Sequence, residues 1–185
     1  MGGYKSWPDS ERSQSHDPLF ILTKVGLKPG MTIVDIGCGQ GYFAIPAAKL
    51  VGKNGKVYGI DIDAEALGVL NEKAAKEGLK NIKTAVGEAE NTMVCEACAD
   101  VVFFGICLHD FQDPTKILEN AKRMLKPSGL LADLDWKKLH MEQGPPYDIR
   151  FSEAKASRLI EDAGFKVRSV EAIGERFYLI ISDKQ

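Results

Sequence analysis

The chain has 185 residues, of which 44% are hydrophobic and 27% charged, a composition that fits one globular domain with a single core. Its formal net charge of −2 provides no general attraction to nucleic acid or to an anionic membrane, so neither is expected as a partner. No run approaches the roughly 20 apolar residues of a membrane span, and segment 1–17 lacks a signal-peptide core. We therefore expect a cytoplasmic protein with one domain over residues 1–185, in which segment 1–16 is flexible or forms a lid.

Short apolar runs alternate with longer amphipathic ones, a pattern typical of β/α units around a mostly parallel sheet. Helices are expected over 17–26, 42–51, 64–77, 114–125 and 153–163, with Asp63, Asp113 and Ser152 as N-caps. Strands are expected over 32–36, 56–61, 82–86, 100–106, 129–135, 165–171 and 176–182. The order predicts five strand–helix units and a C-terminal antiparallel hairpin. This is a doubly wound, Rossmann-like α/β fold with a seven-stranded sheet, whose ligands bind beyond the carboxyl ends of the strands.

The four cysteines give no clear metal site. Cys95 and Cys98 have the CxxC spacing of a zinc or redox pair, but neither a second pair nor a suitably spaced histidine accompanies them. A disulfide is not expected in a cytosolic protein of this size. We interpret the pair as incidental thiols on a surface loop and Cys38 as a packing residue, and we predict that no metal is bound.

A glycine-rich turn, with Gly37, Gly39 and Gly41, lies between the first expected strand and the next helix. Glycine allows a sharp turn and close approach to a ligand, and the helix start offers N–H groups to an anion. The dinucleotide fingerprint G-x-G-x-x-G does not fit, because the third glycine comes one residue early and Tyr42 follows it. Asp35, just before the turn, would repel a pyrophosphate and attract an ammonium group. The combination suits an amino-acid moiety.

A second acidic residue, Asp61, ends the next expected strand, 20 residues after Gly41. A carboxylate at this place binds ribose hydroxyls in nucleotide-binding sheets. S-adenosylmethionine carries both an amino-acid end and a ribose. The joint spacing of Asp35, the three glycines and Asp61 therefore predicts S-adenosylmethionine as the ligand.

Four segments of the chain resemble the class I S-adenosylmethionine-dependent methyltransferases, in the type 11/25 group similar to the ubiquinone/menaquinone-biosynthesis enzymes. These segments are VDIGCGQG at 34–41, VYGIDID at 57–63, VGEAEN at 86–91 and ADVVFFGICLHDFQDPTKILENAKRMLKPSGLL at 99–131. The last ends in LKPSG, where the family usually has LKPGG. The resemblance runs from about residue 17 onward and implies a single methyltransferase domain.

The resemblance also implies which residues bind the cofactor. The methionine part would be held at the ends of the first and fourth strands, by Asp35, Gly37, Gly39, Gly41 and Gly105. The nucleoside part would be held after the second and third strands, by Asp61 at the ribose and by Ile62, Glu88 and Ala89 at the adenine. The family often has Asp at position 88. Tyr42 and Phe43 would either shelter the sulfonium by cation–π contact or pack at the helix start.

Methyl transfer from a sulfonium is an in-line displacement, so the protein mainly positions the acceptor. A hydroxyl or acidic-carbon acceptor also needs a base, whereas a thiolate, arsenic or free amine does not require one. His109, directly after the fourth strand, is the candidate catalytic base, and packing at the strand end is the alternative. Trp136 and His140 are candidates for lining the acceptor pocket, and Arg150 is expected to be an exposed loop residue.

The preferred function is S-adenosylmethionine-dependent methyl transfer to a small-molecule acceptor. Two alternatives are a non-catalytic S-adenosylmethionine-binding module and an NAD-type dehydrogenase on the same sheet, although Asp35 and Tyr42 count against the second. A variant of the preferred function has trivalent arsenic as acceptor, captured by Cys95, Cys98 or Cys107. Because loop 136–151 is short, the acceptor site should be open, small or completed by another subunit, which is compatible with a homodimer.

Overall fold

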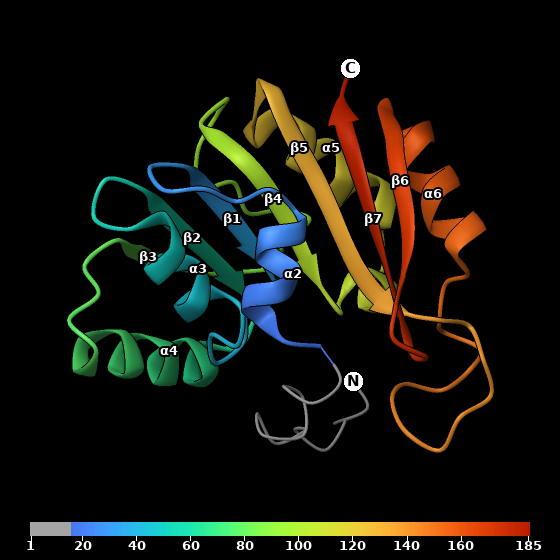
Figure 1. The fold of residues 1–185 in the computed structure, drawn as a ribbon, viewed down its shortest axis with the longest axis horizontal. Helices are drawn as coiled ribbons and strands as arrows, with labels where there is room; N and C mark the ends of the chain where they lie inside the picture. The colour runs from blue at the N-terminus through green and yellow to red at the C-terminus, as the bar shows by residue number, and fades with distance from the viewer. Residues whose placement is uncertain (1–15) are drawn as a thin grey trace.

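A computed structural model of the chain describes residues 16–185. Its centre is one seven-stranded sheet flanked by helices (Figure 1). In spatial order the strands are β3 (Ile82–Val86), β2 (Lys56–Asp61), β1 (Thr32–Ile36), β4 (Ala99–Gly105), β5 (Leu125–Trp136), β7 (Phe177–Lys184) and β6 (Phe165–Ile173). Neighbouring strands from β3 to β5 pair in parallel, while β7 is antiparallel to both β5 and β6. The predicted α/β fold with a C-terminal antiparallel hairpin is confirmed.

Helices cover both faces of the sheet, and each face has its own apolar core. The first core is covered by α2 (Pro18–Lys24), α3 (Ala44–Val51) and α4 (Ala64–Lys76). The second is covered by α5 (Pro114–Met124) and α6 (Glu153–Asp162). Neighbouring residues of β4 point to opposite faces, so that Phe103 belongs to the first core and Phe104 to the second. The continuous apolar sequence of β4 therefore reflects burial on both faces.

The helix starts follow the capping residues expected from the sequence. Asp63 accepts hydrogen bonds from two backbone N–H groups of the first turn of α4, at 2.9 and 3.1 Å. Asp113 and Ser152 each accept one such bond, at the starts of α5 and α6. These side chains satisfy N–H groups that have no partner within the helix, which explains why the helices begin where they do.

Most element ends lie within two residues of the expected ones, and three features differ from the expected pattern. The helix expected at 42–51 begins at Ala44, and the strand expected at 129–135 begins at Leu125, directly after α5. Residues 87–98, between β3 and β4, form turns and bends rather than a helix, so the prediction of five strand–helix units was wrong. The amide of Asn120 on α5 donates to the Glu90 carbonyl at 2.8 Å. The Asn120 side chain thus provides a hydrogen-bond donor for a backbone carbonyl that has no helical partner.

Cys95 and Cys98 form a disulfide within this β3–β4 loop, which corrects the interpretation of two incidental free thiols. Between them Ala97 has a positive φ of 47°, and its N–H donates to the Arg123 carbonyl at 2.9 Å. The turn anchored in this way leaves the two Cα atoms 6.0 Å apart, a separation that a disulfide spans. Over residues 16–185, no group of three potential ligands could hold a metal ion, and no helix is long and apolar enough to cross a membrane.

Arg150 is 2% exposed, which corrects the expectation of an exposed loop residue. Its guanidinium donates to the carbonyls of Pro145, Leu139 and Gln143 at 2.8, 2.9 and 2.9 Å and lies 5.4 Å from the centre of the Trp136 ring. In the irregular loop before α6, several backbone carbonyls have no hydrogen-bond partner in a strand or helix. The planar guanidinium of Arg150 donates to three of them.

Replacing Arg150 by alanine should lower the free energy of unfolding by about 2–4 kcal/mol, because several carbonyls would lose their buried donor. Urea denaturation measures the loss. The matched control is Arg158→Ala on α6, where the side chain is 84% exposed and the nearest carboxylate oxygen lies 3.9 Å away. That control should change stability by less than about 0.5 kcal/mol. Equal losses in the two variants would contradict a structural role for the buried guanidinium.

Candidate active site

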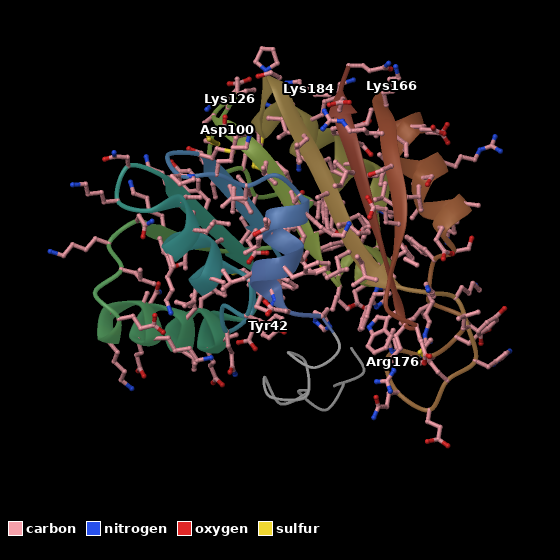
Figure 2. The ribbon with its side chains drawn as sticks, viewed as in Figure 1. Tyr42, Asp100, Lys126, Lys166, Arg176 and Lys184 are labelled. Atoms are coloured by element: carbon pink, nitrogen blue, oxygen red, sulfur yellow. A yellow bond between two sulfur atoms is a disulfide. The ribbon has the colours of Figure 1, made fainter. Side chains whose placement is uncertain are left out.

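A cavity of about 810 Å³ lies at the carboxyl ends of β1, β2 and β4. The chain runs from β1 outward to β2 and β3, then returns to β4 on the other side of β1, so the strand order reverses here. Figure 2 shows Tyr42, one of the lining residues, at this end of the sheet. The Asp100–Lys126 ion pair marks the opposite end. The cavity therefore occupies the position where open parallel sheets bind ligands.

The glycine turn after β1 forms one wall of the cavity. The N–H groups of Gly37 and Cys38 both donate to the Ile60 carbonyl, at 2.8 and 3.1 Å, which ties the turn to β2. Gly37, Gly39 and Gly41 have φ values of 68°, 50° and 89°, a conformation that residues with a Cβ atom rarely adopt. Gly37 and Gly39 line the cavity, whereas Gly41 is outside its lining.

Gly41 and Gly39 differ in what an added Cβ atom would meet. At Gly41 it would lie 2.4 Å from the Cδ1 atom of Leu70, a fully buried residue of α4. At Gly39 it would meet nothing within 4 Å and would project from the cavity wall. The third glycine of the turn is therefore required for packing between the turn and α4.

Gly41→Ala should lower the free energy of unfolding by about 2–4 kcal/mol, through overpacking and an unfavourable φ. Gly39→Ala should cost only about 1 kcal/mol in stability but weaken S-adenosylhomocysteine binding at least about tenfold. Thermal denaturation and calorimetry measure the two effects. A Gly39→Ala protein that binds like the wild type would show that this part of the wall does not contact the ligand.

Asp61 and the loop after β3 form a second wall of the cavity, next to the glycine turn. One carboxylate oxygen of Asp61 accepts from the Gly39 N–H at 2.7 Å and the other from the Asp63 N–H at 2.9 Å. Asp61 thus joins the glycine turn to the end of β2 while facing the cavity. Three other residues assigned to the nucleoside also line this region, namely Ile62, Glu88 and Ala89.

Asp35 is not among the lining residues and is 2% exposed. Its Oδ2 atom has no hydrogen-bond partner among the described residues. Burial, and to a lesser extent the charge of Asp61, raises the pKa of Asp35 to about 8. An ionised carboxylate in this position is costly without a compensating cation. Asp35 does not line the cavity, but the charge of its carboxylate can attract a cationic group of a ligand on the other side of the glycine turn.

An aromatic wall closes the cavity on the side of α3. Tyr42 donates from its hydroxyl to the His16 carbonyl at 2.8 Å, and the His16 and Tyr42 ring centres are 5.4 Å apart. Phe43 lies against Gly105, where an added Cβ would be 2.8 Å from the ring. All four residues line the cavity. His16 was not assigned to the site from the sequence, and the rest of the expected lid lies outside the described residues.

His109 lies behind the cavity wall in a buried ion pair. Its Nδ1 atom is 2.7 and 2.8 Å from the two carboxylate oxygens of Asp135, and the two side chains are 3% and 1% exposed. Its Nε2 atom is 3.4 Å from Oδ1 of Asp110. Burial alone lowers the pKa of His109, but the hydrogen bond and charge of Asp135 more than offset this, so the pKa is raised. Asp110 lines the cavity, and His109 does not.

The expectation that Trp136 and His140 line the acceptor pocket is not met. Trp136 is 4% exposed and packs against Phe177, with ring centres 4.4 Å apart. His140 stacks on Tyr147 at 4.1 Å, in the loop after β5. Neither belongs to the cavity lining, because β5 runs to Trp136 and carries the following loop away from β4.

Comparison with known proteins identifies the family. The model of the "Methyltransferase domain" family matches residues 27–164. The chain is 34% identical to an S-adenosylmethionine-dependent methyltransferase of known structure from Aquifex aeolicus, with a TM-score of 0.88, covering 96% of this chain and 98% of that one. The chain belongs to the class I S-adenosylmethionine-dependent methyltransferases. Its cofactor is accordingly S-adenosylmethionine.

Curated relatives of this methyltransferase are longer proteins. The ubiquinone/menaquinone biosynthesis C-methyltransferase of Laribacter hongkongensis is 32% identical over 130 residues, which cover 70% of this chain and 53% of that protein. The demethylmenaquinone methyltransferase of Staphylococcus aureus (strain MRSA252) is 32% identical over 115 residues, covering 62% and 47%. The methyltransferase thus spans about half the length of the curated relatives it matches.

The site fits the cofactor of this family on its own geometry. The positive φ at Gly39 and the open space before it leave room for a ligand against the turn. The orphaned Oδ2 atom of Asp35 is a buried acceptor that an ammonium group would compensate. Asp61 presents a carboxylate on the same cavity, as ribose hydroxyls require.

Proposed function

We propose that this chain transfers a methyl group from S-adenosylmethionine to a small-molecule acceptor. The observation that carries the proposal is that one cavity has two differently lined parts. One part is lined by the glycine turn and Asp61, and the other by the aromatic wall and Asp110. The first part suits the cofactor, and the second remains for an acceptor. The larger curated relatives include a ubiquinone/menaquinone biosynthesis C-methyltransferase and a demethylmenaquinone methyltransferase, which supports a small acceptor.

In the proposed reaction the cofactor supplies an activated methyl group, and the residues of the chain position the two reactants. The assigned binding roles are those of the family positions: Asp35 and the turn for the methionine part, Asp61 for the ribose, and the residues at 62, 88 and 89 for the adenine. Tyr42 and Phe43 exclude water beside the reacting group. His109 can reach an acceptor only through Asp110, because it is not on the cavity wall.

The alternatives are less well supported. Family membership does not favour an NAD-type dehydrogenase or a non-catalytic binding module. Capture of trivalent arsenic by cysteines is disfavoured by the geometry, because Cys95 and Cys98 do not line the cavity. Cys107 does line it, but its thiol contacts the Ile36 carbonyl at 3.1 Å, and burial raises its pKa well above the usual range.

Calorimetry with S-adenosylhomocysteine, followed by a screen for its formation from S-adenosylmethionine with pooled small acceptors, tests the proposal. Saturable binding and acceptor-dependent product formation are expected. Binding without turnover by any acceptor would favour a non-catalytic module. Saturable NAD binding without S-adenosylhomocysteine binding would favour a dehydrogenase.

Two further parts of the proposal concern the setting of the protein. We propose action in the cytoplasm, which cell fractionation followed by detection of the chain in the cytosolic fraction tests. We also propose that the chain can form a homodimer, which sedimentation equilibrium tests.

A further inference from the structure

We define the acceptor side of the cavity as the lining residues His16, Tyr42, Phe43, Cys107, Asp110 and Phe111. Its apolar surface comes mainly from three aromatic rings, those of Tyr42, Phe43 and Phe111. Its polar side chains are those of His16, Tyr42, Cys107 and Asp110. Tyr42 donates its hydroxyl proton to the His16 carbonyl, and the thiol of Cys107 contacts the Ile36 carbonyl. Asp110 is the carboxylate on this side, with a 43% exposed side chain.

Asp110 is supported from behind by the buried ion pair described above. Nδ1 of His109 is directed at Asp135, and this leaves Nε2 to face Asp110 at 3.4 Å. The line Asp135–His109–Asp110 therefore runs from the protein interior to the cavity surface and ends in a carboxylate. A side chain braced in this way meets a ligand with less loss of conformational freedom than an unsupported one.

The charges around the cavity oppose an anionic acceptor. Lys116 is the one lysine or arginine among the described lining residues, and its ammonium group donates to the Asn91 side chain at 2.6 Å. Carboxylates line the cavity at Asp61, Glu88, Glu90, Asp110 and Asp113. Aromatic faces next to a carboxylate attract a cation, through the ring quadrupole and through direct charge pairing.

We propose that the acceptor half of the cavity takes a small amine with an apolar, ring-sized body, and that the Asp110 carboxylate holds its nitrogen. The inference rests on the proposed methyl transfer and names the acceptor class for the same site. An amine is nucleophilic only when neutral, so an ammonium group must first lose one proton. The Asp110 carboxylate accepts that proton and the nitrogen keeps its lone pair, so that its bond to the methyl carbon would form as the bond from that carbon to sulfur breaks. His109 is a positioning residue, acting through Asp110.

The test uses three probes that share one ring and differ in their polar group: benzylamine, benzyl alcohol and benzoate. Binding of each to the full chain saturated with S-adenosylhomocysteine is measured by calorimetry. Benzylamine should bind at least about tenfold more tightly than benzoate, with benzyl alcohol between them. Asp110→Asn should reduce the preference for the amine at least about tenfold while leaving S-adenosylhomocysteine affinity within about twofold.

Asp113→Asn is the matched control, because it also removes a cavity carboxylate while asparagine retains the N-cap of α5. Its preference for benzylamine should change by less than about twofold, because the Asp113 side chain is directed at the Lys116 N–H at the start of α5. Benzoate binding as tightly as benzylamine, or an unchanged preference in Asp110→Asn, would overturn the proposal. Benzyl alcohol as the tightest probe would replace the amine with a hydroxyl acceptor. Failure of S-adenosylhomocysteine to bind would instead refute the proposed function.

A separate readout tests the positioning role of His109. Burial raises the pKa of Asp110; of the charged groups that face it, His109 lowers this pKa and Asp135 raises it, and the net shift is upward. Benzylamine binding should weaken as the pH falls and Asp110 becomes protonated. His109→Gln removes the neighbouring cation, so the midpoint of this loss should move to higher pH. An unchanged midpoint in a folded His109→Gln protein would exclude action through Asp110.

Discussion

Replacing Asp61 by alanine should weaken S-adenosylhomocysteine binding about 100-fold, because a charged acceptor on the cavity wall would be lost. The same carboxylate receives the N–H groups of Gly39 and Asp63 at 2.7 and 2.9 Å. Its loss therefore also frees the glycine turn from the end of β2. Calorimetry measures the affinity, and the free energy of unfolding should fall by only about 1–2 kcal/mol.

Asp63→Asn is the appropriate comparison, since it removes a carboxylate two residues away and asparagine still caps α4. It should bind S-adenosylhomocysteine with wild-type affinity. If both variants lost affinity equally, the effect would come from the overall charge of the β2–α4 region. If Asp61→Ala bound normally, the ribose assignment would be wrong.

Asp35→Asn should strongly change the pH dependence of stability. The pKa of Asp35 is raised to about 8 in the folded protein, whereas an unfolded aspartate has a pKa of about 3.9. Between these values the folded state binds more protons than the unfolded state, so the stability of the wild type falls as the pH rises. Above about pH 8 both states are ionised, and the decline ends.

An asparagine at this position cannot ionise, so the variant should lack this decline. Between pH 5 and 7.5 its free energy of unfolding, relative to the wild type, should rise by about 3 kcal/mol. Urea denaturation across this pH range measures the difference, with Asp63→Asn as a variant that should follow the wild-type curve. Parallel curves for Asp35→Asn and the wild type would show that the carboxyl titrates normally. The variant should also bind S-adenosylhomocysteine more weakly.

Local patterns predicted most of the fold. Apolar periodicity and capping residues identified the strands and helices, because both depend on residues within a few positions of one another. The count of five strand–helix units was wrong because no helix was expected between residues 86 and 100, and the structure has a loop there. The side chain that anchors this loop, Asn120, lies 30 residues beyond Glu90, outside the range of a local sequence pattern. Arg150 was misjudged for a related reason: its burial depends on how the loop before α6 folds back on itself.

The residues on the cofactor side of the site could be predicted from the sequence more readily than those on the acceptor side. The glycine turn, Asp35 and Asp61 follow one another at short spacing around two adjacent strand ends. The pairing of His109 with Asp135, in contrast, arises from the register of β4 against β5, which the sequence does not specify. A three-residue 3₁₀ helix, Leu108–Asp110, then determines that Asp110 faces the cavity while His109 faces inward.

The Cys95–Cys98 disulfide closes a very short loop, since its cysteines are only three positions apart. Cross-linking such near neighbours excludes few conformations of the unfolded chain, and its entropic contribution to stability is correspondingly small. The bond nevertheless lies in the loop whose residues 87–91 form part of the cavity wall. Reduction by a cellular dithiol would release a local constraint beside the cofactor site while the sheet and both cores stay folded.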